Sequence, residues 1–405
     1  MPRVSAYEMV EVEDALAAIL DRASPLGTEM VPLTAARGRF LAEDVVADAD
    51  LPGLPRSSVD GYAVIASDAA TDLQVLGEVT AGRLGDARVR PGSAMRIMTG
   101  GSLPEGTDAV VMFEDVEEVD GRAILQHKPR QGENVHPVGM DLTAGQAVLS
   151  KGRRIGPAEV GLLATVGCVH VPVFRLPRVA MLATGDELVD PDQAPPPGAV
   201  RDSNRFAVMA AAQDAGAEIV FQAHARDHEA TLERAMRRGL EAADVLITSG
   251  GVSMGTRDLI KPLLERMATI QFGRVSFKPG KPLTFAVTAE GKLCFGLPGF
   301  PVSSLITFEV FVRPALLKLA GAEQVLRPRI EVFLGHDIRR DPVRPEYQRA
   351  TVSWEDHHFV ARTTGLQASS RLMSIVGANA LLEIDPGTET LAKGTMVQAL
   401  LLANL

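Results

Sequence analysis

VAMLAT (residues 179–184) and DVLITSGG (residues 244–251) are the two runs that decide the fold class of this sequence. Each is a short apolar segment that ends in a turn, as a buried strand of a parallel sheet does. Helix-like segments, such as HEATLERAMRRGLEAA (228–243), alternate with apolar runs from about residue 179 to residue 321. This alternation predicts a parallel, doubly wound α/β domain over residues 177–324.

The N-terminal part of the chain has a different pattern, which predicts two units. Leu16 and Ile19 lie at helical spacing, and GPAEVGLLATVG (156–167) reads as a second helix with Pro157 near its first position. Between these helices, short β-type runs such as AVVMF (109–113) alternate with glycine- and proline-rich turns. The expected units are a helical and β base at residues 1–44 and 145–176, and an inserted β domain at residues 45–144.

The segment 325–405 contains only short β-type runs and turns such as IDPGTETLAKGT (384–395). Short strands without helices are typical of a small β-barrel or sandwich, and we expect the barrel. The whole chain is therefore expected to be an α/β multidomain protein. It should combine the N-terminal base and inserted β domain with the central doubly wound domain and a C-terminal β-barrel.

Composition narrows the function. The chain has 405 residues, a formal net charge of −10 and 4% aromatic residues, which argues against a nucleic-acid platform and against a basic membrane-binding face. Its two cysteines, Cys168 and Cys294, lie far apart in apolar runs, so neither a disulfide framework nor a zinc site is expected. The first 20 residues do not resemble a signal peptide, and we expect a cytoplasmic protein.

Two loops follow the strands that decide the fold, and ligands of doubly wound sheets bind at such loops. Thr184-Gly185-Asp186-Glu187 carries acids that could bind a cation or could cap the next helical turn. Ser249-Gly250-Gly251, continuing through Ser253, could cradle a phosphate with successive N–H groups, or could be a tight turn without a ligand. Residues alone leave both alternatives open.

Charged residues in other loops suggest metal and anion binding. Asp60, Asp141, Asp227 and Asp258 stand in or beside turns, where carboxylates suit Mg²⁺, although each alone could be an ordinary solvated acid. Lys278-Pro-Gly-Lys281-Pro holds two ammonium groups on a stiff backbone, which favours a bound anion over a surface hairpin. In the C-terminal segment, Arg349 and Ser369 could add a guanidinium and a hydroxyl, or could be surface residues.

Seven motifs occur together in an order that resembles the molybdopterin molybdenumtransferases, whose framework also forms the C-terminal enzyme domain of gephyrin. They are SSVDGYAV, RIMTGG, GEN…GMD, ATGDEL, ITSGGVSMG, FKPGKPL and GLPGFPVS. The resemblance implies insertion of molybdenum from molybdate into adenylylated molybdopterin, with release of AMP and formation of molybdenum cofactor. It also implies an Mg²⁺ cofactor and a homodimer whose active site joins the α/β domain of one subunit to the N-terminal half of its partner.

The resemblance assigns roles residue by residue. The catalytic set is Asp60, Asp141, Asp227, Asp258, Lys278 and Lys281, and the metal ligands are Glu187, Asp227 and Asp258. The substrate-binding set is Thr99, Thr184, Gly185, Ser249, Gly250, Gly251, Ser253, Pro298, Pro301, Arg349 and Ser369. Of these, Lys278, Lys281, Arg349 and Ser369 are expected to form the molybdate pocket.

Two positions depart from the family pattern: Phe300 stands where Asn is usual, and Thr256 stands where an acid is common. They leave room for a paralogue that prefers tungstate. The rival functions are a molybdopterin adenylyltransferase and a non-catalytic pterin-binding scaffold. The adenylyltransferase and proteins that process the finished cofactor are candidate partners; nucleic acid and membrane are not.

Overall fold

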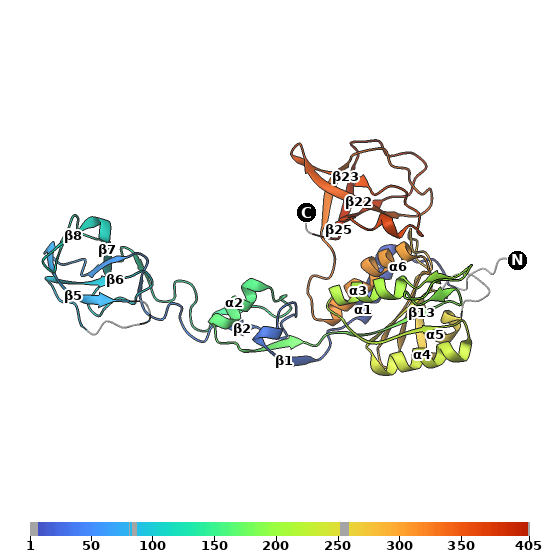
Figure 1. The fold of residues 1–405 in the computed structure, drawn as a ribbon, viewed down its shortest axis with the longest axis horizontal. Helices are drawn as coiled ribbons and strands as arrows, with labels where there is room; N and C mark the ends of the chain where they lie inside the picture. Colours follow the sequence, from blue (N-terminus) through green and yellow to red (C-terminus); the bar gives the residue numbers. More distant parts are fainter. Residues whose placement is uncertain (1–6, 81, 83–86, 252–258, 404–405) are drawn as a thin grey trace.

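The chain is elongated and consists of four units, three of them in a row and the fourth beside the last (Figure 1). The computed structural model describes residues 7–80, 82, 87–251 and 259–403. One six-stranded sheet lies at one end of the molecule, a slender base follows, and the α/β unit with a β-barrel beside it forms the other end. No helix in these described ranges has the length and apolar character needed to cross a membrane.

The α/β unit is built on a six-stranded sheet in the order β16-β13-β17-β20-β19-β18. Its first four strands are parallel, as the apolar runs predicted, but β19 and β18 are antiparallel additions at one edge. An apolar run such as LTFAV shows burial and not direction, so the sequence could not separate the two cases. The strands are β13 Arg178–Thr184, β16 Glu218–Ala225, β17 Val245–Ser249, β18 Ala268–Phe272, β19 Thr284–Thr288 and β20 Leu293–Leu297.

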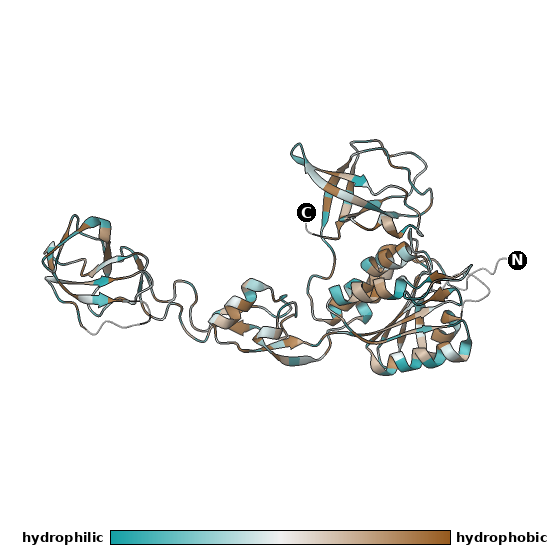
Figure 2. Ribbon diagram, viewed as in Figure 1, coloured by the Kyte–Doolittle hydropathy of each residue, from teal (hydrophilic) through white to brown (hydrophobic). Residues whose placement is uncertain are grey.

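Helices cover both faces of this sheet, as a doubly wound fold requires. On one face α4 and α5 bury a hydrophobic stripe, and Figure 2 shows hydrophilic residues along the outer side of α4. On the other face α3, α6 and α7 share a core with α1, although sequence order places α1 beside the base. The helices are α1 Val12–Arg22, α3 Asn204–Asp214, α4 Glu229–Ala242, α5 Ile260–Met267, α6 Pro301–Thr307 and α7 Arg313–Leu319, with a π-helical turn η3 Phe308–Val312 between the last two.

The base is thin and formed by segments from both sides of the inserted sheet. Strand β1 pairs with β12, β2 pairs with β11, and α2 begins at Pro157 as the sequence predicted. Leu41, Leu163 and Val171 are fully buried between these elements. The elements are β1 Thr28–Pro32, β2 Val45–Val46, β11 Ala147–Leu149, α2 Pro157–Thr165 and β12 His170–Phe174.

The inserted β domain is a six-stranded sheet in the order β7-β4-β6-β5-β9-β8. Two chain segments connect it to the base, and they are joined by the short pair β3 Arg56–Ser57 and β10 Val135–His136. Gly61 shows how closely this sheet is packed, because a Cβ there would lie 2.0 Å from the Val111 carbonyl oxygen. The strands are β4 Gly61–Val64, β5 Asp72–Val79, β6 Ser93–Ile97, β7 Ala109–Met112, β8 Val116–Val119 and β9 Arg122–Leu125.

The C-terminal unit is a closed five-stranded barrel, which settles the choice between barrel and sandwich. Its strand β22 is joined to the α/β unit at Lys278, whose N–H donates to the Pro345 carbonyl (3.0 Å) and whose carbonyl accepts from the Tyr347 N–H (2.8 Å). The Phe277 and Tyr347 rings pack against each other beside this joint. The strands are β21 Arg329–Leu334, β22 Glu346–Glu355, β23 His358–Thr363, β24 Ala380–Ile384 and β25 Met396–Leu401.

An ion pair fastens the base to the α/β unit, and its removal should be costly. The Arg175 guanidinium donates two 2.7 Å hydrogen bonds to Asp244, which also accepts the Arg178 N–H at 2.9 Å. We expect Asp244→Ala to lower the free energy of unfolding by roughly 2 kcal/mol, because three donors lose a charged acceptor. Urea titration at pH 7 measures the change, with the exposed Asp192→Ala as the control.

The pH dependence of the difference in unfolding free energy between wild type and Asp244→Ala is a second test of the Arg175–Asp244 pair. Burial raises the Asp244 pKa, but the bonds from Arg175 and Arg178 lower it more, so the net shift is downward. A carboxyl with a depressed pKa stabilises the fold above its unfolded pKa and loses that contribution as pH falls through its folded pKa. The gap between wild type and Asp244→Ala should therefore close in acid, and a gap independent of pH would contradict this account.

Candidate active site

The carboxyl ends of β13 and β17 lie together and form a close-packed floor for a ligand. Gly250, at φ 90°, has no room for a side chain, because a Cβ there would lie 2.5 Å from the Thr184 carbonyl oxygen. Thr184 is buried, and its Oγ1 has no hydrogen-bond partner among the described residues. The predicted residues Thr184, Gly185, Ser249, Gly250 and Gly251 are therefore brought to one place; Ser253 lies outside the described residues.

Asn204, the first residue of α3, ties this floor to the turn after β20, and sequence reasoning missed it. Its Nδ2 donates to the Ser249 Oγ (2.9 Å) and to the Gly299 carbonyl (2.8 Å). The predicted residues Pro298 and Pro301 flank that turn, and the Phe300 ring between them is 59% exposed. The signal for Asn204 was its place at the start of the helix after VAMLAT, where a side-chain amide can reach the strand ends.

The predicted metal ligands stand at the edge of the same floor. The Asp227 N–H donates to the Asp186 carboxylate at 3.2 Å, and a Cβ on Gly185 would lie 2.6 Å from the Glu187 Oε2, so these two loops are neighbours. Asp258 lies outside the described residues. Within the part of the chain that the structure describes, no three His, Cys, Asp or Glu side chains form a ready metal cage.

A second cavity, of about 610 Å³, lies at the seam between the α/β unit and the barrel. It contains the predicted residues Lys278, Lys281 and Ser369, and also Ser303 from α6, which the sequence did not single out. The loop of residues 366–370 forms its barrel side. Lysine and serine side chains on opposite sides of one cavity can bind a tetrahedral oxyanion.

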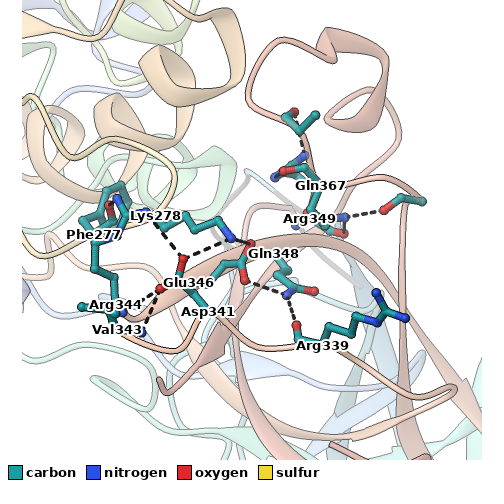
Figure 3. A network of polar contacts seen from close by, with 12 residues as sticks. Phe277, Lys278, Arg339, Asp341, Val343, Arg344, Glu346, Gln348, Arg349 and Gln367 are labelled. Carbon is teal, nitrogen blue, oxygen red and sulfur yellow. Dashed lines mark hydrogen bonds and ion pairs between the residues drawn. The ribbon is translucent and has the colours of Figure 1, made fainter. Parts of the chain in front are cut away.

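Lys278 is held by two carboxylates from the barrel, and sequence reasoning missed both. Its Nζ lies 3.3 Å from Asp341 Oδ2 and 3.2 Å from Glu346 Oε1, as Figure 3 shows. Burial raises the Asp341 pKa, but the Val343 and Arg344 amides and Lys278 bring it down to about 2. Asp341 is therefore charged at neutral pH, and the two carboxylates orient the Lys278 ammonium and compensate its charge.

Lys281 carries the less compensated charge. Among the described residues it has no ion pair, and burial together with the neighbouring Arg274 and Arg344 lowers its pKa from 10.5. Lowering the pKa of an ammonium group means that the folded protein disfavours its charge, and a bound anion would reverse that preference. A bound anion would therefore stabilise the charged form of Lys281 directly.

This shift predicts the alkaline limit of anion binding. Affinity for a dianion should fall as pH rises through the lowered Lys281 pKa, and therefore at a pH below 10.5. In Lys281→Arg the fall should move to higher pH, because a guanidinium stays protonated there. Equilibrium dialysis against molybdate from pH 7 to 11 measures both curves. Identical curves for wild type and Lys281→Arg would exclude Lys281 as the titrating group.

Arg349 is not placed as the sequence suggested. It is neither a surface residue nor a lining residue of the cavity, because its side chain is fully buried behind the loop 366–370. Its guanidinium donates to the Ser374 Oγ and to the carbonyls of Gln367 and Ala368. In this conformation residues 367 and 368 accept hydrogen bonds from Arg349, which does not line the cavity, and its contact with molybdate stays a prediction.

Asp60, Thr99 and Asp141 form a separate group at the connection between the inserted sheet and the base. Asp60 Oδ1 accepts the Thr99 N–H (2.6 Å) and the Thr99 Oγ1–H (2.8 Å), and these bonds lower the Asp60 pKa. Thr99 and Asp141 line a cavity of about 620 Å³ together with Arg56 and His136. The base separates this connection from the α/β unit and the barrel, whose seam contains Lys278, so one subunit does not unite the two groups (Figure 1).

Three family models match the chain in order. Residues 10–167 match the MoeA N-terminal region (domains I and II), residues 180–318 match a probable molybdopterin-binding domain, and residues 331–402 match the MoeA C-terminal region (domain IV). The molybdopterin molybdenumtransferase of Haemophilus influenzae is 33% identical over 96% of this chain and 98% of its own length.

Two further comparisons agree with these matches. Gephyrin of Dictyostelium discoideum is 36% identical over the whole of this chain, which spans 64% of the length of that gephyrin. A crystal structure of the molybdopterin biosynthesis MoeA protein from Pyrococcus horikoshii superposes with a TM-score of 0.84 at 32% identity, covering 98% of this chain and all of that one.

Proposed function

Because the chain belongs to the molybdopterin molybdenumtransferase family, enzymes of molybdenum cofactor biosynthesis, we propose that it inserts molybdenum from molybdate into adenylylated molybdopterin and releases AMP. The observation that carries this proposal is the cavity with Lys278 and Lys281 at the seam of the α/β unit and the barrel. Molybdate is a dianion, and Lys281 is a partly buried cation in that cavity that has no ion pair among the described residues. We place the reaction in the cytoplasm.

The chain's own groups have separable tasks in this reaction. Lys281, Ser303 and Lys278 hold the oxyanion in the cavity, and fixed positive donors also stabilise the charge that develops during transfer. The glycine turn at 249–251 takes the phosphates of the adenylylated pterin, since its backbone can approach them closely. Asn204 keeps that turn and the turn at residue 299 at a fixed spacing.

Magnesium fits the donor set at the floor of the α/β unit. Glu187 and Asp227 offer carboxylate oxygens, the ligand type that Mg²⁺ prefers, and Asp258 of the same predicted set would join them. Mg²⁺ usually takes part of its ligands from substrate phosphates and water, so a few carboxylates of the chain suffice to hold it. When bound, the ion would neutralise the pyrophosphate of the substrate.

We further propose a homodimer in which each site is completed by Asp60, Thr99 and Asp141 of the partner. Within one chain these residues lie where the base connects to the inserted sheet, and the base separates that connection from the α/β unit and the barrel, whose seam contains the lysines (Figure 1). The intervening base and its connections to the inserted sheet expose large apolar side chains, including Met30 and Met140 at about 60% exposure. Such apolar exposure on a slender unit favours burial against a second copy.

A single-turnover assay with adenylylated molybdopterin and Mg²⁺ tests the proposed reaction. AMP release and molybdenum incorporation should both depend on added molybdate. ATP consumption with pyrophosphate release would instead identify an adenylyltransferase, and pterin binding without turnover would identify a scaffold. Running the assay with tungstate in parallel determines the preferred oxyanion, and Phe300→Asn tests whether the exposed ring at that turn sets the preference.

A further inference from the structure

Charged side chains from three parts of the chain meet at the junction of the base, the α/β unit and the linker 320–328, which leads to the barrel. They are Arg154 of the base, Glu309 and Arg313 of the α/β unit, and Arg327 of the linker. The Glu309 Oε1 lies 2.5 Å from the Arg327 Nε and 3.5 Å from the Arg313 Nε. Arg154 is close enough for its charge to act on Arg313. We call these four residues the arginine cluster.

Packing and hydrogen bonds hold the arginine cluster at this junction. The Arg313 Nη1–H donates to the Val325 carbonyl at 3.1 Å, which fixes the linker to the α/β unit. Phe40 of the base and Leu317 of α7 belong to one buried apolar cluster, and the backbone of Arg154 pairs with that of Phe40. The guanidinium groups are therefore carried by segments that pack together.

The arginine cluster has an excess of positive charge. Within the described part of the chain, Glu309 is the one carboxylate within 4 Å of any of its three guanidinium groups. The side chains of Arg313 and Arg327 are only 18% and 25% exposed, so water screens their charges incompletely. Burial and the charges of Arg327 and Arg154 lower the Arg313 pKa, and Glu309 opposes this only in part. A bound anion would relieve this repulsion.

The backbone that carries Glu309 and Arg313 is also unusual. Glu309 lies in the π-helical turn η3, and Arg313 directly follows the end of that turn. Turns of this kind are rare and are frequent at functional sites. None of the four residues lines the cavity that contains Lys278 and Lys281, so the proposed reaction does not account for the turn or for the charges beside it.

We propose that the arginine cluster is a separate binding site for a phosphate-class oxyanion, which ties together the base, the α/β unit and the linker to the barrel. A guanidinium group presents two parallel N–H donors that match the oxygens of a phosphate, and several arginines can share one such anion. Inorganic phosphate and diphosphate have this chemistry in common. The ligand is not a substrate of the proposed reaction, so the inference goes beyond the proposed function.

Equilibrium dialysis against phosphate and, in a second arm, diphosphate tests this site at constant ionic strength. The background variant Lys278→Ala/Lys281→Ala removes the charges of the other cavity from the measurement. In that background Arg154→Gln should weaken binding roughly tenfold, because a charge-assisted bond is lost. Arg153→Gln is the matched control, since this neighbouring arginine pairs with Glu159 instead, and it should change affinity by no more than about twofold.

Glu309→Gln gives a prediction of opposite sign. Removing the carboxylate should tighten phosphate binding roughly fivefold or more, because it repels the anion at short range. If the arginine cluster were merely a structural ion-pair network, the same variant would lower stability without any gain in affinity. Hydrogen exchange locates the site, because phosphate should slow the exchange of peptides that cover residues 150–156 and 322–328.

The outcomes are independent of molybdate and of turnover, so failure of the proposed function leaves them unaffected. Equal affinities in Arg154→Gln and Arg153→Gln, or no gain in Glu309→Gln, would overturn the site. Unchanged exchange at residues 150–156 and 322–328, or no binding of either anion at millimolar concentration, would do the same. Binding of diphosphate alone, with the expected effects of the variants, would support the site and identify its ligand as a diphosphate.

Discussion

Lys278→Ala should reduce molybdate-dependent AMP release about 100- to 1,000-fold, the usual cost of removing one positioned donor from an anionic transition state. The change also affects its two partners. Asp341 and Glu346 lie 3.3 and 3.2 Å from the ammonium, and both would be left without that cation at the wall of the cavity. In the wild type, three cations (Lys278, Lys281 and Arg344) lie near the two carboxylates, which leaves a net positive charge. In the variant, two cations and two carboxylates remain, and this net positive charge is lost.

The double variant Lys278→Ala/Glu346→Gln separates these two effects. If the carboxylates of Asp341 and Glu346 repel the oxyanion once Lys278 is removed, neutralising Glu346 should recover part of the lost affinity. The double-variant cycle then gives the coupling energy between Lys278 and Glu346. Lys393→Ala, an exposed lysine of the same barrel, is the matched control and should retain full activity. Activity within threefold of the wild type in Lys278→Ala would exclude this cavity as the site of the oxyanion.

Mixed dimers of Asp60→Ala and Lys281→Ala subunits should regain activity that neither homodimer has. Asp60 is held by Thr99 near the inserted sheet. Lys281 lies in the cavity between the α/β unit and the barrel, and these two units form the other end of the chain (Figure 1). If each site takes these residues from different subunits, one site of the mixed dimer is intact and the other lacks both. Activity should therefore reach about half that of the wild type. Co-expression with two affinity tags yields the mixed dimer for the single-turnover assay.

The matched control for this experiment combines Lys278→Ala with Lys281→Ala. Both lysines lie in the same cavity of one chain, so each site of that mixed dimer lacks one of them and no activity should return. Recovery in both mixtures would indicate contamination by a wild-type enzyme or an artefact of the assay. Recovery in neither mixture would contradict a site shared between subunits.

The layers of the fold could be predicted from the sequence because buried strands and amphipathic helices have different periods. VAMLAT and DVLITSGG are strands β13 and β17, and Pro157 begins α2. Strand direction could not be predicted at the edge of the sheet, where β19 turns antiparallel. The sequence also could not show that α1 packs into the core of the α/β unit, because an apolar helix face does not identify its partner.

The candidate site could be predicted only where residues adjacent in sequence act together. Lys278 and Lys281 share one stiff loop, so their proximity follows from the backbone. Asp341 reaches Lys278 from another domain, and no local pattern could show that contact. Along β22, the period of two places Arg349 and Glu346 on opposite faces, but it cannot say that Arg349 lies behind a loop while Glu346 faces the lysine.

The base has a consequence for the order in which a ribosome-bound chain can fold. Strand β1 ends at Pro32 but pairs with β12, which begins at His170, so the base stays open until the inserted sheet has been synthesised. The strands of that sheet pair only with one another, within residues 61–125, so the sheet can form before the base is complete. Helix α1 stays unpacked for longer, because part of the core that buries it comes from α7 at residues 313–319. Helix α1 thus precedes the other described helices in the sequence but is buried only after α7 has been synthesised.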